Sequence, residues 1–237
     1  DLVTYAAIAH QIGHADVVAQ FLARPESYFL SPIDRVQWRT SDYVGKTAKL
    51  EAKLDKMIEA AFDTAHRLFG LSFEPVDAAL YHPDARAWNV TDAQGRHVAL
   101  FIGDYFARPS KHSGAWMTAL RDQERLTGDI RPIVLNVCNF SKPAPGEPAL
   151  LSFDDAHTLF HEFGHGLHGM LSDVTYPLLA GTAVPSDFVE LPSQLYEHWL
   201  EVPEILEKHA LHARTGEPMP KALLDRLLAT RTFNQGF

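Results

Sequence analysis

One stretch of the sequence, residues 158–170, constrains this chain more than any other. It reads T-L-F-H-E-F-G-H-G-L-H-G-M and contains the pattern H-E-x-x-H at His161, Glu162 and His165. On a helix, residues four apart lie on one face about one turn apart, so the two imidazoles can hold one metal ion. Glu162 is rotated by roughly 100° on the same helix and can stand beside the metal without binding it. A general base for a water on zinc needs that place, so the pattern predicts a zinc-dependent hydrolase.

A catalytic zinc site needs three protein ligands and one open position, so a third ligand must lie elsewhere. His168 is near the same helical face, but it sits about 10 Å along the axis from His161, which bonds of about 2 Å cannot bridge. We therefore expect His168 to orient other groups or to pack in the core. The metzincin pattern is excluded because Leu171 occupies the position of its last histidine.

A carboxylate from a following helix would complete a His₂Glu site, and Glu190 fits this role. It follows His165 by 25 residues, and Pro177, Gly181 and Pro185 in the intervening segment allow a second helix to fold back.

Three other glutamates lie on this or the next helical stretch. Glu197 shares a helical face with Glu190, so it either orients a ligand or is an ordinary, partly buried carboxylate. Glu201 and Glu204 are interpreted as surface charges. A second histidine pair, His10 and His14, has Gln11 where the base would stand, so it could bind a metal without hydrolysing a substrate. We interpret it instead as an ordinary helix with two surface histidines.

The composition of the 237 residues is that of a globular protein, with 46% hydrophobic and 22% charged residues. The formal net charge of −9 argues against a nucleic-acid partner, because phosphate binding needs a basic patch. No run approaches the roughly 18 apolar residues of a membrane span and no signal peptide is visible, so no membrane partner is expected. Cys138 is the only cysteine, which excludes an internal disulfide and predicts a buried thiol.

Helical periodicity is strong over residues 48–69, where Gly70 follows as a stop signal. The motif helix is predicted to cover residues 153–170, because Ser152 and Asp155 form a capping-box pattern at its start. Further helices are predicted at residues 1–23, at residues 186–199, between Pro203 and Gly216, and after Pro220.

Short apolar runs typical of strands cover residues 71–76, 87–90, 98–101 and 132–137. The turn D-A-Q-G at residues 92–95 predicts a hairpin. Residues 105–128 are interpreted as loop and helix, residues 25–46 as a loop or short helices, and residues 141–148 as a connection. The fold class predicted is mainly α with a small β-sheet (α+β). We place a boundary between a helical part, residues 1–70, and a mixed catalytic region, residues 71–237.

Several segments resemble the thimet oligopeptidase family of zinc peptidases, family M3. The most specific are F-H-E-F-G-H-G-L-H-G-M at residues 160–170 and D-F-V-E-L-P-S-Q-L-Y-E-H-W at residues 187–199. Three others agree: Y-H-P-D-A-R-A-W at 81–88, D-Y-F-A-R-P-S-K-H-S-G-A-W-M at 104–117 and N-V-C-N-F-S-K-P at 136–143. The likeness covers roughly residues 50–237 and is nearest to the bacterial peptidyl-dipeptidase branch.

This resemblance implies a zincin-like core and a cytoplasmic peptidase that acts on short, unstructured peptides. It places one Zn²⁺ on His161, His165 and Glu190, and the general base on Glu162. It favours release of C-terminal dipeptides, with an endo-acting oligopeptidase as the alternative. It also implies that residues 112–117 form a strand lining the substrate cleft, where Gly114 would let a peptide backbone approach closely.

Two departures from the family are expected to matter. Family members are longer and carry a glycine-rich loop with Tyr and His after the zinc helices, whereas this sequence ends at Phe237. Loss of an oxyanion donor typically costs about 10² to 10³ in rate, so a fragment that binds zinc or peptide without efficient turnover is a competing hypothesis. Residues 1–46 match the family poorly. A third hypothesis, a structural zinc domain, predicts that chelation unfolds the chain.

Overall fold

The computed structural model describes residues 52–213 and 215–230. The helix predicted at residues 1–23, the connection at 25–46 and the His10/His14 pair lie outside the described residues. The chain divides into two compact units, Leu50–Met219 and a second that combines Asp1–Lys49 with Pro220–Phe237. In the second unit, α11 (Lys221–Thr230) follows Pro220, as predicted. Every other element described below belongs to the first unit.

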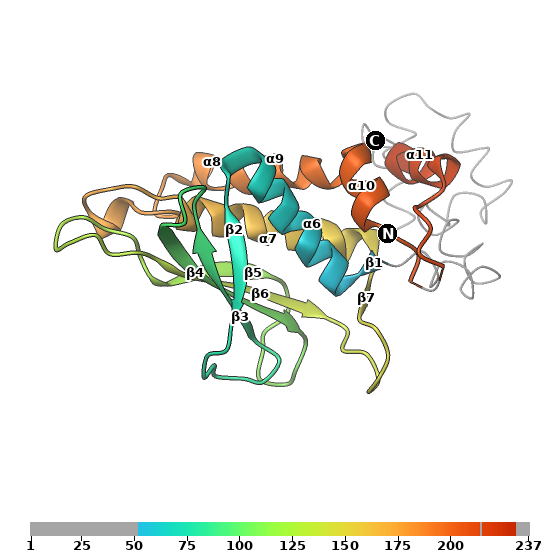
Figure 1. Cartoon of the computed structure of the whole chain (residues 1–237), viewed down its shortest axis with the longest axis horizontal. Helices are drawn as coiled ribbons and strands as arrows, with labels where there is room; N and C mark the ends of the chain where they lie inside the picture. The colour runs from blue at the N-terminus through green and yellow to red at the C-terminus, as the bar shows by residue number, and fades with distance from the viewer. Residues whose placement is uncertain (1–51, 214, 231–237) are drawn as a thin grey trace, which may run out of the picture. The chain divides into compact units, whose positions relative to one another are not determined.

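A five-stranded mixed sheet has the order β2–β3–β4–β6–β5 (Figure 1). Its strands are β2 (Ser72–Val76), β3 (Arg86–Thr91), β4 (His97–Phe106), β5 (Trp116–Arg121) and β6 (Ile133–Phe140). β4 and β6 run parallel, and the other neighbouring pairs are antiparallel. β4 lies inside the sheet and is apolar over most of its length, because both of its faces are buried.

The hairpin predicted at residues 92–95 is confirmed and joins β3 to β4. Asp92 Oδ1 accepts hydrogen bonds from the backbone N–H groups of Gln94, at 3.0 Å, and Arg96, at 2.9 Å. Gly95 has a φ of +75°, a backbone conformation that residues other than glycine rarely adopt. Local turn chemistry therefore sets the register of this pair.

The prediction for residues 105–128 is wrong in part, because this segment contains a strand. β4 continues to Phe106, and β5 forms the edge of the sheet through pairing with β6. The sequence of β5, W-M-T-A-L-R, lacks a clean alternation of apolar and polar residues, so only its non-local partner specifies the strand. The sheet is larger than predicted, and the architecture is mixed rather than mainly helical.

The helices of the first unit lie across one face of this sheet (Figure 1). They are α6 (Leu54–Phe69), α7 (Phe153–Met170), α8 (Ser186–Val189), α9 (Leu191–Leu200) and α10 (Pro203–His209), with the 3₁₀ helix η1 (Pro177–Leu179). α7 contacts β4, β5 and β6 as well as α6 and α9, so it is the central helix of the unit.

α7 begins and ends where the sequence predicts. Ser152 Oγ accepts a hydrogen bond from the Asp155 backbone N–H at 3.1 Å, and Asp155 Oδ2 accepts one from the Ser152 N–H at 3.0 Å. This capping box satisfies two groups at the helix start.

Three other helix boundaries differ from the prediction. α6 starts at Leu54, because Ala52–Lys53 form β1, which pairs with β7 (Leu150–Leu151). The helix predicted over 186–199 is broken at Glu190, since Pro192 lacks the N–H that a continuous helix needs. α10 ends at His209 rather than near Gly216, and Leu211 instead forms a bridge with Pro218.

The core between the helices and the sheet is aromatic. Phe62 of α6 stacks on Phe73 of β2 with ring centroids 4.0 Å apart, and Phe163 of α7 lies 5.2 Å from Phe101 of β4. α6 shares this core with α7 and the sheet, so residue 70 lies within the compact unit Leu50–Met219. The domain boundary proposed near that residue stays a prediction. Cys138 is buried and unpaired, as predicted, and burial raises the pKa of its thiol.

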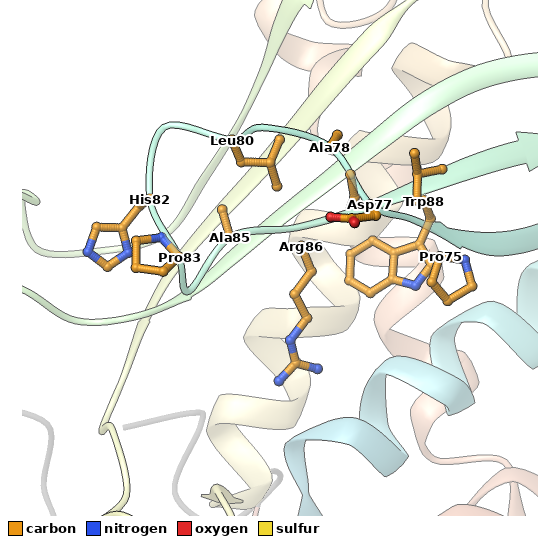
Figure 2. A pocket seen from close by; sticks show the side chains of 11 residues that line it. Pro75, Asp77, Ala78, Leu80, His82, Pro83, Ala85, Arg86 and Trp88 are labelled. Carbon is orange, nitrogen blue, oxygen red and sulfur yellow. The ribbon is translucent and has the colours of Figure 1, made fainter.

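The opposite face of the sheet is covered in part by the segment between β2 and β3. Leu80 packs there against a buried cluster: Ala85, Ala87, Ile102, Leu135 and Val137. A cavity of about 510 Å³ lies along this segment (Figure 2). Arg86 extends from its wall towards α6, where its Nη1 lies 2.5 Å from Asp55 Oδ1. None of the helices in the described residues combines the length and apolarity that crossing a membrane requires.

Candidate metal centre

α7 presents His161 and His165 on one face, one turn apart. Their ring centroids are 4.8 Å apart with an interplanar angle of 83°. Glu190, at the break between α8 and α9, points its carboxylate at both rings: Oε2 lies 3.3 Å from His161 Nε2 and 3.1 Å from His165 Nε2. The structure therefore brings together the three residues that the sequence singles out as ligands.

The broken helix is what places Glu190. Ser193, one turn into α9 and fully buried, donates a hydrogen bond from Oγ to Glu190 Oε2 at 2.9 Å. This bond lowers the pKa of Glu190, and the nearby His165 and His161 lower it further, so the carboxylate stays ionised. α9 can come this close because Gly164 has no side chain: a Cβ there would lie 2.7 Å from Ser193 Cα.

Glu197 contacts a candidate ligand, as one of the two readings of the sequence predicts. Its Oε1 lies 2.5 Å from His161 Nδ1. A carboxylate can only accept, so Nδ1 carries the hydrogen, and Nε2 keeps its lone pair towards Glu190. Glu197 thus fixes His161 in the tautomer that a metal ligand needs.

This contact extends into a network that the sequence reading missed. Glu197 Oε2 lies 3.2 Å from His157 Nδ1, and His157 Nε2 lies 3.2 Å from Glu201 Oε1. Glu201 therefore faces α7 and is not a simple surface charge. The signal was present in the sequence: His157 precedes His161 by one helical turn, and Glu201 follows Glu197 by one.

Glu162 lies on the sheet side of α7 and is 6% exposed. Its Oε2 has no hydrogen-bond partner among the described residues. Burial raises the pKa of this carboxyl to about 7, an effect that His161 opposes and Glu190 reinforces. A buried carboxyl with a free oxygen and a pKa near neutrality can take up and give back a proton.

The other candidate histidines differ in their surroundings. Burial, reinforced by His161, lowers the pKa of His165, which favours the neutral imidazole that binds metals. His168 lines an apolar cavity of about 590 Å³ with Leu167 and Leu171, and its ring centroid lies 6.0 Å from that of Phe188. His168 thus packs among apolar side chains, which is one of the two roles expected for it.

The donor set fits a divalent metal such as zinc. One atom from each of His161, His165 and Glu190 lies within 4.8 Å of the others, and the described residues contain no other group of three that could hold an ion. Two imidazoles and one carboxylate make up a His₂Glu site with a fourth position left open. Neither the cavity of about 510 Å³ nor that of about 590 Å³ includes these residues or Glu162.

Comparison with known proteins places this arrangement in a family. Residues 31–237 match the model of Peptidase family M3. The chain belongs to this family. The M3 chain is 49% identical over 180 residues to a dipeptidyl carboxypeptidase of Salmonella typhimurium and 48% identical over 180 residues to one of Escherichia coli. It is 40% identical over 183 residues to oligopeptidase A of Escherichia coli.

These matches cover 76% of the M3 chain but only 26% of each dipeptidyl carboxypeptidase and 27% of oligopeptidase A. The chain therefore spans about a quarter of the length of these relatives. The family membership predicted from the motifs is confirmed.

Proposed function

We propose that this chain carries the catalytic centre of a zinc peptidase that acts on short oligopeptides and releases dipeptides from their C-termini. The observation that carries the proposal is the unpartnered Oε2 of buried Glu162 beside a three-ligand cluster. Structural zinc sites are closed by four protein ligands, whereas this cluster provides three and leaves one position open. That difference favours catalysis over the structural alternative.

His161, His165 and Glu190 would hold zinc, which would act as a Lewis acid that activates water as a nucleophile and polarises the peptide carbonyl. Glu162 accepts a proton from the attacking water as the new C–O bond forms. It then delivers that proton to the amine nitrogen as the C–N bond breaks. Its raised pKa suits both transfers, because the carboxyl gains and loses a proton near neutral pH. Glu197 holds His161 in its binding orientation throughout.

The edge strand β5 supports the binding of an extended peptide. No other strand of the described residues pairs with its outer side, so its backbone groups are available to a substrate strand. β5 packs against α7, with Met117 facing Gly169. The strand that the family resemblance implies at 112–117 begins at Trp116, and residues 112–115 lead into it.

Release of dipeptides is favoured over internal cleavage by the higher identity to the dipeptidyl carboxypeptidases than to oligopeptidase A. A second candidate function is zinc or peptide binding without efficient turnover. A cytoplasmic location, expected from the resemblance, stays a prediction.

An internally quenched fluorescent peptide tests the proposal. We expect the zinc-loaded chain to cleave it, Glu162→Gln to lower the rate by at least about a hundredfold at unchanged zinc content, and the exposed control Glu74→Gln to cleave normally. Mass spectrometry of the products then separates dipeptide release from internal cleavage. Zinc and peptide binding without cleavage in any variant would support the second function. Equal rates for wild type and Glu162→Gln would contradict the assigned base.

A further inference from the structure

The segment between β4 and β5, residues 107–115, is here called the entry loop. Two side chains fasten it to the rest of the sheet. Lys111, whose side chain is 4% exposed, donates from Nζ to three backbone carbonyls, those of Asp104 at 3.0 Å, Phe106 at 2.8 Å and Cys138 at 2.5 Å. Lys111 thereby closes the first half of the loop onto β4 and β6.

Asn139 of β6 fastens the second half. Its Nδ2 donates to the carbonyl oxygens of His112, at 2.6 Å, and Gly114, at 2.7 Å. A side-chain amide nitrogen has two hydrogens, so both are used on the entry loop. Gly114 has a φ of +93°, and a Cβ there would meet nothing within 4 Å, so the backbone at this point faces open space.

The Asn139 anchor is level with the catalytic base. α7 and β6 run side by side: Gly169 lies against Val134, and Gly166 against Asn136. Continuing in the same direction, Cys138 is close enough to Glu162 for the carboxylate to influence its pKa. Asn139 is the next residue of β6, so along the strand the anchor lies at the level of Glu162 rather than at the far end.

We propose that Asn139 is a positioning residue for the substrate. By holding the carbonyls of His112 and Gly114, it fixes where β5 begins, and this start sets the register in which a peptide paired with β5 passes Glu162. A register error would displace the scissile bond from the site, because the spacing along a strand is about 3.3 Å per residue. The inference rests on the proposed peptidase function.

The test uses zinc-loaded Glu162→Gln as the background, so that a bound peptide is not cleaved. The probe is a pentapeptide with an N-terminal fluorescein and a free C-terminal carboxylate, and its affinity is read by fluorescence anisotropy. Hydrogen–deuterium exchange of residues 112–118 is measured in parallel, without peptide. Asn139→Asp keeps the shape and removes both donors, and Asn139→Ala removes them without adding a charge. The matched control is Asn89→Asp, because Asn89 is also a half-buried strand residue but lies on β3 and contacts His97 of β4.

For both Asn139 variants we expect about tenfold weaker peptide binding, faster exchange confined to residues 112–118 and unchanged zinc affinity. Asn89→Asp should change none of these. Unchanged exchange at residues 112–118, or faster exchange with unchanged peptide affinity, would overturn the inference while leaving the peptidase proposal intact. Loss of zinc affinity in the Asn139 variants would overturn it as well, because the residue would then support the whole site. If the background variant binds zinc but no peptide, the proposed function fails, and the inference falls with it.

Discussion

His161 donates a hydrogen bond from Nδ1 to Glu197, and its Nε2 lies beside Glu190. The bond to Glu197 orients the imidazole so that Nε2 faces the candidate metal position. His165 differs, because its Nδ1 has no partner among the described residues. Of the two histidines, His161 is the one whose metal binding depends on a neighbouring carboxylate.

Glu197→Ala removes that carboxylate. We expect zinc affinity to fall about 10- to 100-fold, because the imidazole loses the acceptor that fixes its tautomer and orientation. Competition with a chromogenic chelator measures the change. Glu204→Ala, an exposed glutamate on α10, is the matched control and should bind zinc as the wild type does. Equal affinity of both variants would show that Glu197 does not orient the ligand.

Asp104 anchors a buried ionic cluster near the end of β4. Because of this cluster, we expect the stability of the fold to fall in acid. It accepts hydrogen bonds from Arg108 at 2.6 and 2.7 Å, from Tyr81 at 2.7 Å and from Lys111 at 3.1 Å. Burial by itself would raise the pKa of this carboxyl, but these bonds outweigh it and lower the pKa to about 2. The folded pKa thus lies below the unfolded value, so its stabilisation is present above about pH 4 and is lost as the pH falls towards 2.

This loss corresponds to about 2 kcal/mol of unfolding free energy. Urea unfolding at several pH values between 5 and 2 measures it as the stability difference between wild type and Asp104→Asn, which should shrink as the pH falls. Asp173→Asn, at an exposed ion pair with Arg125, should differ little from wild type across the range. A constant difference for Asp104→Asn would contradict the assigned titration.

The packing of α7 on α9 is the element-level contact that assembles the centre. Gly164→Ala places a Cβ 2.7 Å from Ser193 Cα and 2.9 Å from the Pro192 carbonyl oxygen, both backbone atoms that cannot yield alone. We expect α9 to move outward with Glu190, and zinc affinity to fall at least about tenfold, despite alanine's higher helix propensity.

Gly169→Ala on the same helix is the control for Gly164→Ala. Its Cβ meets the end of the flexible Met117 side chain at 2.6 Å, which can rotate away, and Val134 at 3.2 Å. We expect a smaller loss of stability and no loss of zinc affinity, read by thermal melts and chelator competition. Similar zinc affinities for the two variants would mean that α9 does not depend on the Gly164 contact.

At the scale of the whole molecule, the aromatic core and the metal centre occupy different places. The cluster that includes Phe62, Phe101 and Phe163 lies between the helices and the sheet, whereas the ligands lie between α7 and α9. The first unit therefore has a core that needs no metal. Metal removal is expected to weaken the fold without abolishing it.

EDTA should lower the melting temperature of the zinc-loaded chain by about 5–10 °C, since saturation at 100 times Kd adds about 2.7 kcal/mol. Circular dichroism at 25 °C should still show a folded chain. The melting temperature of His165→Ala should be the same with and without EDTA. Unfolding by EDTA at 25 °C would favour the structural zinc domain instead.

The sequence by itself determined the candidate ligand set and the helix that carries two of its members. H-E-x-x-H and the capping box at Ser152 depend on local spacing, which one helix decides without reference to the rest of the chain. Glu190 could also be chosen, because helix rise removed His168 and a carboxylate remained at a workable separation. The same spacing of one helical turn relates His157 to His161 and Glu201 to Glu197, so these two residues could also be predicted from the sequence.

Only the tertiary structure decided β5 and the anchoring of the entry loop. β5 exists through pairing with β6, and Asn139 reaches carbonyls 25 and 27 residues earlier in the chain. Glu162 combines a property that the sequence determines with one that the tertiary structure determines. Its place in the motif follows from the sequence, whereas its raised pKa follows from burial, which no local pattern sets. Long-range packing creates these features, so local sequence periodicity does not predict them.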